Sequence, residues 1–388
     1  MDQTDRPGRI DRTYRLLALC ARAEGHPVFY EQLIRQVEGY SAWQELPSKA
    51  EFYGLAPLVW HHMHQSGVSV PRETERTLRD LYLRHRVLNQ VHTKVLTNIN
   101  ILFESAGLQA LLLKGLALAY RYYPDPALRP VGDIDLLLEQ ADFLPALDLL
   151  IKAGFRAISS NQPSERIPKK LVAESPPQNG LRVHLELHCH EPKGKSILDN
   201  PLENEFEDFH EPPQTLRVHD CNVQVPAPID TLRYLSGHLR LHLLGSHAER
   251  PLQLKWSADF ISIIEREAES IDWDYLKRYS PDILKRLDVF YSLTPMPEQL
   301  ARVIPVRQIS PPEGLDQYLK GWPVQSFSQR RQVGFWRLLW RTFTPPSAWW
   351  LCLYYGIGKW YVFWYGQIVY RLQILRMMLL RSVRSSEK

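Results

Sequence analysis

The chain has 388 residues, of which 44% are hydrophobic and 23% charged, a balance that is typical of globular proteins and excludes an extensively disordered chain. Its four scattered cysteines form no CxxC pair, which argues against a disulfide framework or a structural zinc site and fits a reducing compartment. The net charge is +4, but ten basic residues and a single acid follow Ser328, so the rest of the chain is net acidic, which argues against general nucleic-acid binding.

Residues 1–105 are predicted to form a helical region. Apolar residues recur at helical spacing at Tyr14, Leu17 and Ala21, and the same pattern runs through residues 78–87 and 89–103. Several amphipathic helices are therefore expected before the pattern changes near residue 108.

Residues 106–227 are predicted to form a compact α/β unit. Mostly apolar or alternating runs predict strands, and stretches with helical periodicity lie between them. Gly154 follows the second helical stretch, at the position where glycine commonly ends a helix. The expected strands are 108–113, 133–139, 155–159, a short one around Leu171, and 181–190, and the expected helices are 116–123 and 143–151.

The chain is expected to become helical again over residues 228–328. Three stretches, 229–244, 252–267 and 273–279, have clear helical periodicity, whereas residues 291–328 are rich in Pro, Gln and Gly and give no clear pattern. The predicted fold is therefore α+β, with a small mixed-sheet core flanked by N- and C-terminal helical regions.

Residues 329–388 are predicted to be an aromatic and basic C-terminal tail. Between Thr342 and Tyr370 the only charged residue is Lys359, and glycines interrupt the apolar run, so a membrane-spanning helix is the least favoured interpretation. A helix packed on the body, or against a second copy, is favoured over a helix lying on an anionic membrane surface. The first residues are polar and contain no apolar signal segment, so we expect a cytoplasmic protein, peripheral at the inner membrane face under the membrane-surface interpretation.

Two carboxylates lie two residues apart on the predicted strand 133–139. Asp133 and Asp135 therefore point to the same face, while Ile134 points the other way, into a core. Ionised carboxylates on one face usually share a cation, and Mg²⁺ or Mn²⁺ would bind both the carboxylates and a substrate phosphate. By itself, the pair is equally compatible with two solvated acids on an exposed strand.

A third carboxylate, Glu186, occurs in the alternating strand 181–190. Two-metal phosphoryl transfer uses three acids, so Glu186 would complete the site if its strand lies beside the strand of Asp133. The histidines on the same face span about 20 Å, which excludes one shared zinc ion. For most of them the favoured interpretation is an exposed polar face: His184, His188 and His190.

A lysine and a glycine follow the first predicted strand. Backbone N–H groups after Gly115 and the charge of Lys114 would suit a phosphate group. The alternative is an ordinary strand-to-helix turn with a solvated lysine. Arg129 is another candidate phosphate ligand, and its alternative is a structural ion pair with Asp133 or Asp125.

The segment from Leu111 to Phe155, followed by the strand VHLELHCH, resembles the bacterial uncharacterised nucleotidyltransferase family, which belongs to the DNA polymerase beta-like nucleotidyltransferase superfamily. The similarity extends to about Leu276. The residues that match the family pattern occur in order along the chain: Lys114, Gly115, Tyr123, Pro124, Arg129, Asp133, Asp135, Gly154, Phe155, Glu186 and His188.

The resemblance implies transfer of a nucleoside monophosphate from an NTP to an acceptor, assisted by two Mg²⁺ or Mn²⁺ ions. It implies that Asp133, Asp135 and Glu186 are the catalytic metal ligands, and that Lys114, Gly115 and Arg129 bind the nucleotide. Three features depart from the wider superfamily: Gly115 is followed by leucine in place of Gly or Ser, the gap from Gly115 to Asp133 is longer than in compact members, and Glu186 replaces the more usual Asp. A protein, peptide, small molecule or carbohydrate acceptor is open, as are a different phosphotransfer on the same site and a catalytically inactive scaffold.

Overall fold

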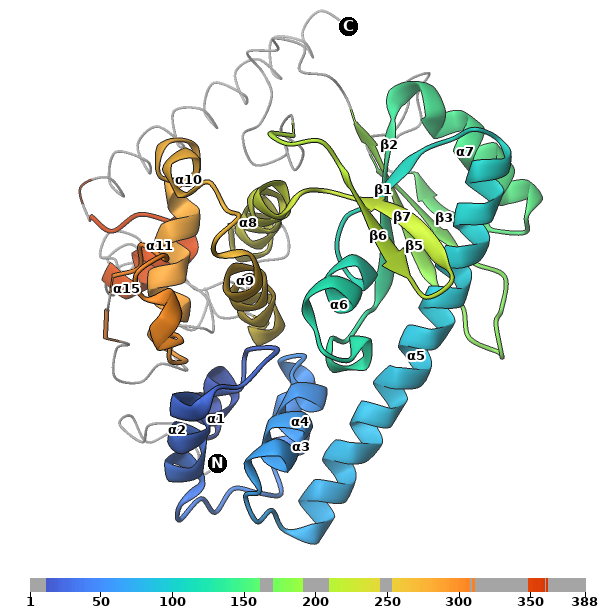
Figure 1. The fold of residues 1–388 in the computed structure, drawn as a ribbon. Coiled ribbons are helices and arrows are strands. Elements are labelled where there is room, and N and C mark those ends of the chain that lie inside the picture. The colour runs from blue at the N-terminus through green and yellow to red at the C-terminus, as the bar shows by residue number, and fades with distance from the viewer. Residues whose placement is uncertain are drawn as a thin grey trace, which may run out of the picture.

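The computed structural model describes residues 12–160, 170–190, 209–244, 253–307, 309–310, 348–359 and 361. Within these ranges a mixed seven-stranded sheet is flanked by helices, which confirms the predicted α+β fold. Figure 1 shows the long helix α5 (Arg72–Ser105) running from the N-terminal helices to the sheet, with the C-terminal helices on the opposite side of the sheet from α5.

The N-terminal region is helical, as predicted. Helix α5 is 34 residues long and joins two parts of the molecule. Near its start, Leu78 and Tyr82 pack in a core made with other helices, whereas Ile99 and Phe103 near its end pack under the sheet. The four helices before it are α1 (Arg12–Leu19), α2 (Pro27–Val37), α3 (Leu46–Phe52) and α4 (Ala56–Ser66).

The strands form one sheet in the order β3-β4-β5-β2-β1-β7-β6. At its centre, β2 pairs in parallel with β5 on one side and antiparallel with β1 on the other. The prediction for β2 is confirmed in full, while β1 is shorter than expected. The strands are β1 (Ala110–Leu112), β2 (Asp133–Glu139), β3 (Arg156–Ser160), β4 (Lys170–Glu174), β5 (His184–His190), β6 (Gln214–Val218) and β7 (Cys221–Val225).

The two faces of the central strands have different partners. Ile134 and Leu136 of β2, with Leu185 and Leu187 of β5, pack in a core with α5 and α7 (Gln140–Lys152). Leu137 points the other way and belongs to the core made by the C-terminal helices. Because side chains alternate along a strand, the acidic residues of β2 and β5 share the face of Leu137.

The hairpin of β6 and β7 was not expected from the sequence. The outer strand β6 is half-exposed and rich in polar residues, so its apolar alternation is weak. The turn contains His219 and Asp220, and His219 adopts a left-handed φ of 52°. The turn lacks the Asn-Gly or Asp-Gly pair that commonly marks a tight hairpin, so the local sequence does not predict this hairpin.

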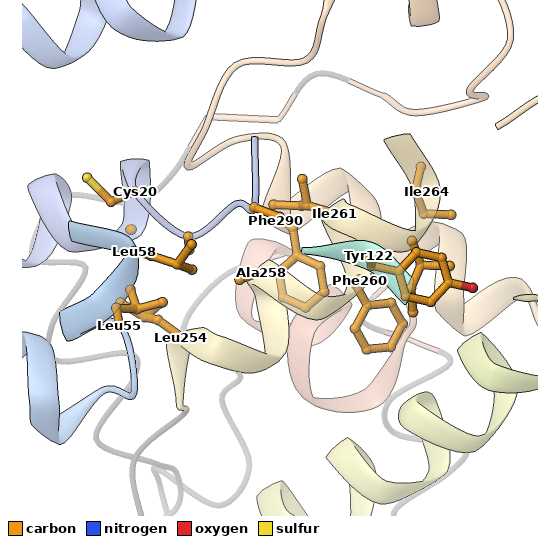
Figure 2. Close-up of a cluster of buried hydrophobic side chains, with 14 of the residues drawn as sticks. Cys20, Leu55, Leu58, Tyr122, Leu254, Ala258, Phe260, Ile261, Ile264 and Phe290 are labelled. Atoms are coloured by element: carbon orange, nitrogen blue, oxygen red, sulfur yellow. The ribbon is translucent and has the colours of Figure 1, made fainter. Parts of the chain in front are cut away.

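The C-terminal helices share a single hydrophobic core with the N-terminal ones. Figure 2 shows this core, in which Leu55 and Leu58 from the N-terminal helices lie near Leu254 of α9, and Phe260 approaches Phe290. The boundaries at residues 105, 227 and 328 stay predictions, but the two helical regions pack as one layer. Its C-terminal helices are α8 (Pro228–Leu244), α9 (Leu254–Glu267), α10 (Trp273–Tyr279) and the unpredicted α11 (Pro281–Phe290).

The described part of the tail is a helix that packs on the body. In α15 (Ala348–Tyr355) the side chains of Trp349, Leu351 and Leu353 are buried. The Trp349 indole donates a hydrogen bond to the Ser292 hydroxyl at 2.8 Å, and the Arg286 Nε donates to the Leu353 carbonyl at 3.1 Å. Among the described residues no helix combines the length and hydropathy needed to cross a bilayer. All eight arginines of residues 329–388 lie outside the described residues, so contact with a membrane surface stays a prediction.

A buried histidine in the N-terminal core predicts acid sensitivity. His62 of α4 is fully buried, and burial lowers its pKa to about 3, against about 6.5 in an unfolded chain. Below pH 6.5 the unfolded chain therefore takes up a proton that the native protein does not, and stability falls as the pH falls. Between pH 7 and pH 5 this histidine is expected to cost about 2 kcal/mol.

The measurement is urea unfolding at both pH values for the wild type, His62→Gln and His64→Gln. The His62→Gln variant should lose about 2 kcal/mol of the pH dependence. His64 is exposed on the same helix, so His64→Gln should keep it. An unchanged pH dependence in His62→Gln would contradict the prediction, because it would show that His62 takes up no more protons in the unfolded chain than in the folded protein.

Candidate active site

The sheet places Glu186 directly beside Asp135. In the parallel pair of β2 and β5, Asp133 lies opposite His184 and Asp135 lies opposite Glu186. Directly opposed residues point to the same face of a sheet. The sequence-based condition for a three-carboxylate site, adjacent strands for Asp133 and Glu186, is therefore met.

Asp135 is the centre of this group and is fully buried. Its Oδ1 lies 3.1 Å from the Lys114 Nζ and 3.2 Å from the His188 Nε2. Its Oδ2 is also buried and has no hydrogen-bond partner among the described residues. The interpretation of Asp135 as a solvated surface acid is thus wrong, and one oxygen of a buried carboxylate is left open to a ligand.

Lys114 reaches Asp135 from the end of β1. The Leu113 backbone N–H donates to the Asp135 carbonyl at 3.1 Å, which holds this end of the chain against β2. The Lys114 side chain is only 13% exposed. Burial alone would lower the pKa of Lys114, but Asp135 and the other carboxylates outweigh it and raise the pKa, so the ammonium stays charged. The alternative of a solvated lysine is therefore wrong.

Glu186 is held by a lysine and a histidine. The Lys170 Nζ lies 2.6 Å from the Glu186 Oε2, and the His188 Nε2 lies 3.6 Å from the same oxygen. Burial would raise the pKa of Glu186, but its polar contacts with His188 and Lys170 lower it strongly, so this group is ionised. His188 is buried, which corrects the expectation of an exposed polar face, whereas His184 is exposed as expected.

Asp133 is the first residue of β2 and is half-buried. It interacts with the charge of Lys255 from the helical layer. Burial, with the charges of Asp135 and Glu186, raises the pKa of Asp133, while Lys114 and Lys255 oppose this. Lys255 comes from the first turn of α9. Burial is the main cause that lowers the pKa of Lys255, and the charge of Arg129 adds to it, while Asp259 and Asp133 oppose the shift.

Helix α8 supplies a histidine to the same region. His238 is largely buried, and burial and the positive charge of Lys114 hold its pKa well below the usual range, so the ring is neutral. Its ring lies 4.4 Å from that of His242 and 6.1 Å from that of Trp256. These ring contacts place the two histidines in packing contact with each other and with Trp256.

Arg129 forms a buried ion pair with Asp259 of α9, and not with Asp125 or Asp133. Its Nε and Nη2 donate to the two carboxylate oxygens at 2.7 and 2.9 Å. The Tyr123 hydroxyl donates to the same Asp259 Oδ1 at 2.8 Å. Arg129 is thus in a structural ion pair, but its partner is 130 residues away and is neither of the two aspartates that were expected.

The same arginine also holds the turn after Lys114. Its Nη1 donates to the Gly115 carbonyl at 3.1 Å, at the start of α6 (Leu116–Tyr122). Gly115 has a left-handed φ of 61°, and a Cβ there would lie 3.2 Å from the Asp133 carbonyl oxygen. Both the backbone conformation and this close approach favour glycine. The Lys114–Gly115 turn is therefore anchored to both the acids and the helical layer.

The sequence profile of the uncharacterised nucleotidyltransferases matches residues 40–292, which is more than half of the chain. The chain belongs to this family. No curated protein matches the chain. The family match covers the N-terminal helices from α3, the sheet, and the C-terminal helices through α11, so family membership extends over the helical layer as well as the site.

The residues in the site are suited to a divalent cation, as expected for a family of nucleotidyltransferases. Among the described residues, Asp135, Glu186 and His188 have ligand atoms that all lie within 4.8 Å of one another. The unpartnered, buried Asp135 Oδ2 is the observation that supports the fit, because a buried carboxylate oxygen without a partner is costly. Asp133 shares the same face but is not a member of this group.

Four residues at the site were not expected from the sequence. The alternation of β5 puts His188 on the face of Glu186, so its position could have been read as functional. Lys170 lies beside Leu171 in the expected short strand, but no local pattern marks Lys170 or Lys255 as functional. No local pattern indicates a partner for Asp259 either, because its ion pair with Arg129 depends on the packing of α9.

Proposed function

We propose that the protein transfers a nucleoside monophosphate from an NTP to an acceptor. The acceptor nucleophile would attack the α-phosphorus, the bond from that phosphorus to the bridging oxygen would break, and pyrophosphate would leave with the electron pair. Membership of a nucleotidyltransferase family supports the reaction class. The observation that supports this site most strongly is the pairing of Asp135 with Glu186 across β2 and β5, with an unpartnered oxygen on Asp135.

Each carboxylate has a role in this proposal. Asp133 and Asp135 would hold divalent cations, Mg²⁺ or Mn²⁺, and Glu186 would hold the ion near the acceptor. When bound, such ions neutralise the charge that develops on the phosphoryl oxygens. The raised pKa of Asp133 fits this role, because a cation beside it would relieve the repulsion from Asp135 and Glu186.

Three basic residues would act on the phosphates, one of them indirectly. Lys114 and the Gly115 backbone would contact the triphosphate, and Lys255, whose charge interacts with Asp133, would face it from α9. Arg129 was expected to bind the nucleotide directly. Its donors are engaged by Asp259 and Gly115, so we assign it instead to positioning the Lys114–Gly115 turn.

The test supplies the purified full-length protein with NTPs labelled at the α- or the γ-phosphate, together with Mg²⁺ or Mn²⁺ and cell extract as a source of acceptors. Transfer of the α-label with release of pyrophosphate is expected. It should be absent in Asp133→Asn/Asp135→Asn and retained in Asp148→Asn, whose side chain is 61% exposed on α7.

The two rival functions give different results. Transfer of the γ-label alone would identify a different phosphotransfer on the same site. Absence of acid-dependent transfer and of NTP binding with all four nucleotides would contradict the enzyme and favour a scaffold that keeps the fold.

A further inference from the structure

One side chain in the site differs in chemical type from the carboxylates around it. The His188 Nε2 lies 3.2 Å from the Asp135 Oδ1 and 3.6 Å from the Glu186 Oε2, and the residue is 2% exposed. Its nitrogen and an oxygen of each acid lie within 4.8 Å of one another. One nitrogen donor and two oxygen donors therefore lie close enough together to contact the same bound ion.

The separations match those of ligands that share one ion. Metal–ligand bonds of about 2.1 Å, at the angles of octahedral or tetrahedral coordination, put neighbouring ligand atoms about 3.0–3.4 Å apart. The 3.2 Å distance from His188 to Asp135 lies within this range, and the 3.6 Å distance from His188 to Glu186 exceeds it by about 0.2 Å. Small side-chain rotations would bring all three atoms into position.

The carboxylates of Asp135 and Glu186 could also accept a cation in addition to, or in place of, their lysine partners. The Asp135 Oδ2 is buried without a hydrogen-bond partner among the described residues, although Lys114 contacts its other oxygen. Lys170 contacts Glu186, but its side chain is 46% exposed and can move toward solvent. A divalent ion beside Asp135 and Glu186 would satisfy the open oxygen and could take the place of the Lys170 ammonium.

We infer that His188 is a metal ligand together with Asp135 and Glu186, and that its imidazole makes this site prefer first-row transition-metal ions over Mg²⁺. Imidazole nitrogen suits transition metals, whereas Mg²⁺ takes oxygen ligands and keeps much of its water. The inference rests on the proposed function in one respect, namely that a cation binds at these acids. The new part is the kind of metal ion that the side chains of the site would select.

The experiment measures metal binding to the full-length protein without nucleotide. Mn²⁺ is titrated by electron paramagnetic resonance, Mg²⁺ is titrated in competition with it, and pulsed measurements record coupling of the bound Mn²⁺ to nitrogen-14. The wild type should bind Mn²⁺ at least about 10-fold more tightly than Mg²⁺ and show nitrogen coupling. His188→Gln should bind Mn²⁺ about 10- to 100-fold more weakly, lose the coupling, and change its Mg²⁺ affinity much less.

His184→Gln is the matched control. His184 lies on the same face of β5, opposite Asp133, but is exposed. This variant should keep both the Mn²⁺ affinity and the nitrogen coupling. Because the coupling is measured in the wild type and in His184→Gln, the inference stays testable even if His188→Gln does not fold.

Two results would overturn the inference. Bound Mn²⁺ without nitrogen coupling in the wild type would show that His188 is not a ligand. An equal loss of Mn²⁺ and Mg²⁺ affinity in His188→Gln would show that it only positions Asp135. Nitrogen coupling without any nucleotide transfer would support the metal site and contradict the proposed function, so the two failures are distinguishable.

Discussion

Replacing Asp135 with asparagine is expected to reduce nucleotide transfer about 10³-fold. The substitution keeps the shape of the side chain but removes the negative charge at the centre of the site, which contacts Lys114 and His188. Charge stabilisation by a bound cation contributes several kcal/mol to such reactions, and each 1.36 kcal/mol changes the rate about tenfold. The measurement is the initial rate of α-label transfer under the conditions of the functional assay.

Two comparisons show whether the loss is specific to the site. Asp148→Asn makes the same chemical change on the exposed face of α7 and should leave the rate within about twofold, as expected for a surface substitution. Circular dichroism and the urea midpoint of Asp135→Asn separate a catalytic loss from unfolding. A folded Asp135→Asn that transfers label at the wild-type rate would remove Asp135 from the reaction.

Replacing Asp259 with alanine is expected to destabilise the protein by about 3–5 kcal/mol. Arg129 is 6% exposed in its side chain and is paired with both Asp259 oxygens, so the substitution leaves a buried charge without its partner. The Tyr123 hydroxyl loses its acceptor at the same time. The free energy of unfolding is measured by urea denaturation.

The control for this prediction is the same substitution in an exposed ion pair. Asp148 pairs with Lys152 one helical turn away on α7, and Asp148→Ala should cost no more than about 0.5 kcal/mol. A second comparison uses Arg129→Met/Asp259→Asn, which removes the buried charge and keeps an acceptor for Tyr123. It should be more stable than Asp259→Ala. Equal costs for Asp259→Ala and Asp148→Ala would show that the buried pair does not stabilise the fold.

These two predictions concern connected parts of the structure. Arg129 donates to the Gly115 carbonyl, Lys114 precedes that glycine, and its ammonium contacts Asp135. The hydrogen bonds therefore run from α9, through the turn after β1, to the central carboxylate. The helical layer carries part of the support for the site, as well as covering the sheet.

The local pattern of the sequence was enough to locate the central strands and their acids. Strand β2 begins and ends at the predicted residues, and the alternation of β5 correctly assigned Glu186 to one face. Side-chain alternation is a property of each strand by itself, so it can be read without knowing the partner strand. Helices α1 and α5 before the core, and the first three helices after it, follow from their 3.6-residue periodicity for the same reason.

Partners that are far apart in the chain could be recognised only in the folded protein. The ion pair of Arg129 with Asp259, the position of Lys255 and the burial of His188 all depend on how α9 and the sheet come together. A charged side chain gives the same local signal whether it ends in solvent or beside a partner 130 residues away. The sequence by itself thus determined the central strands, the helices with clear periodicity and the acidic residues of the site. Tertiary packing decided which side chains meet there, because burial and ion pairing arise from contacts between distant segments.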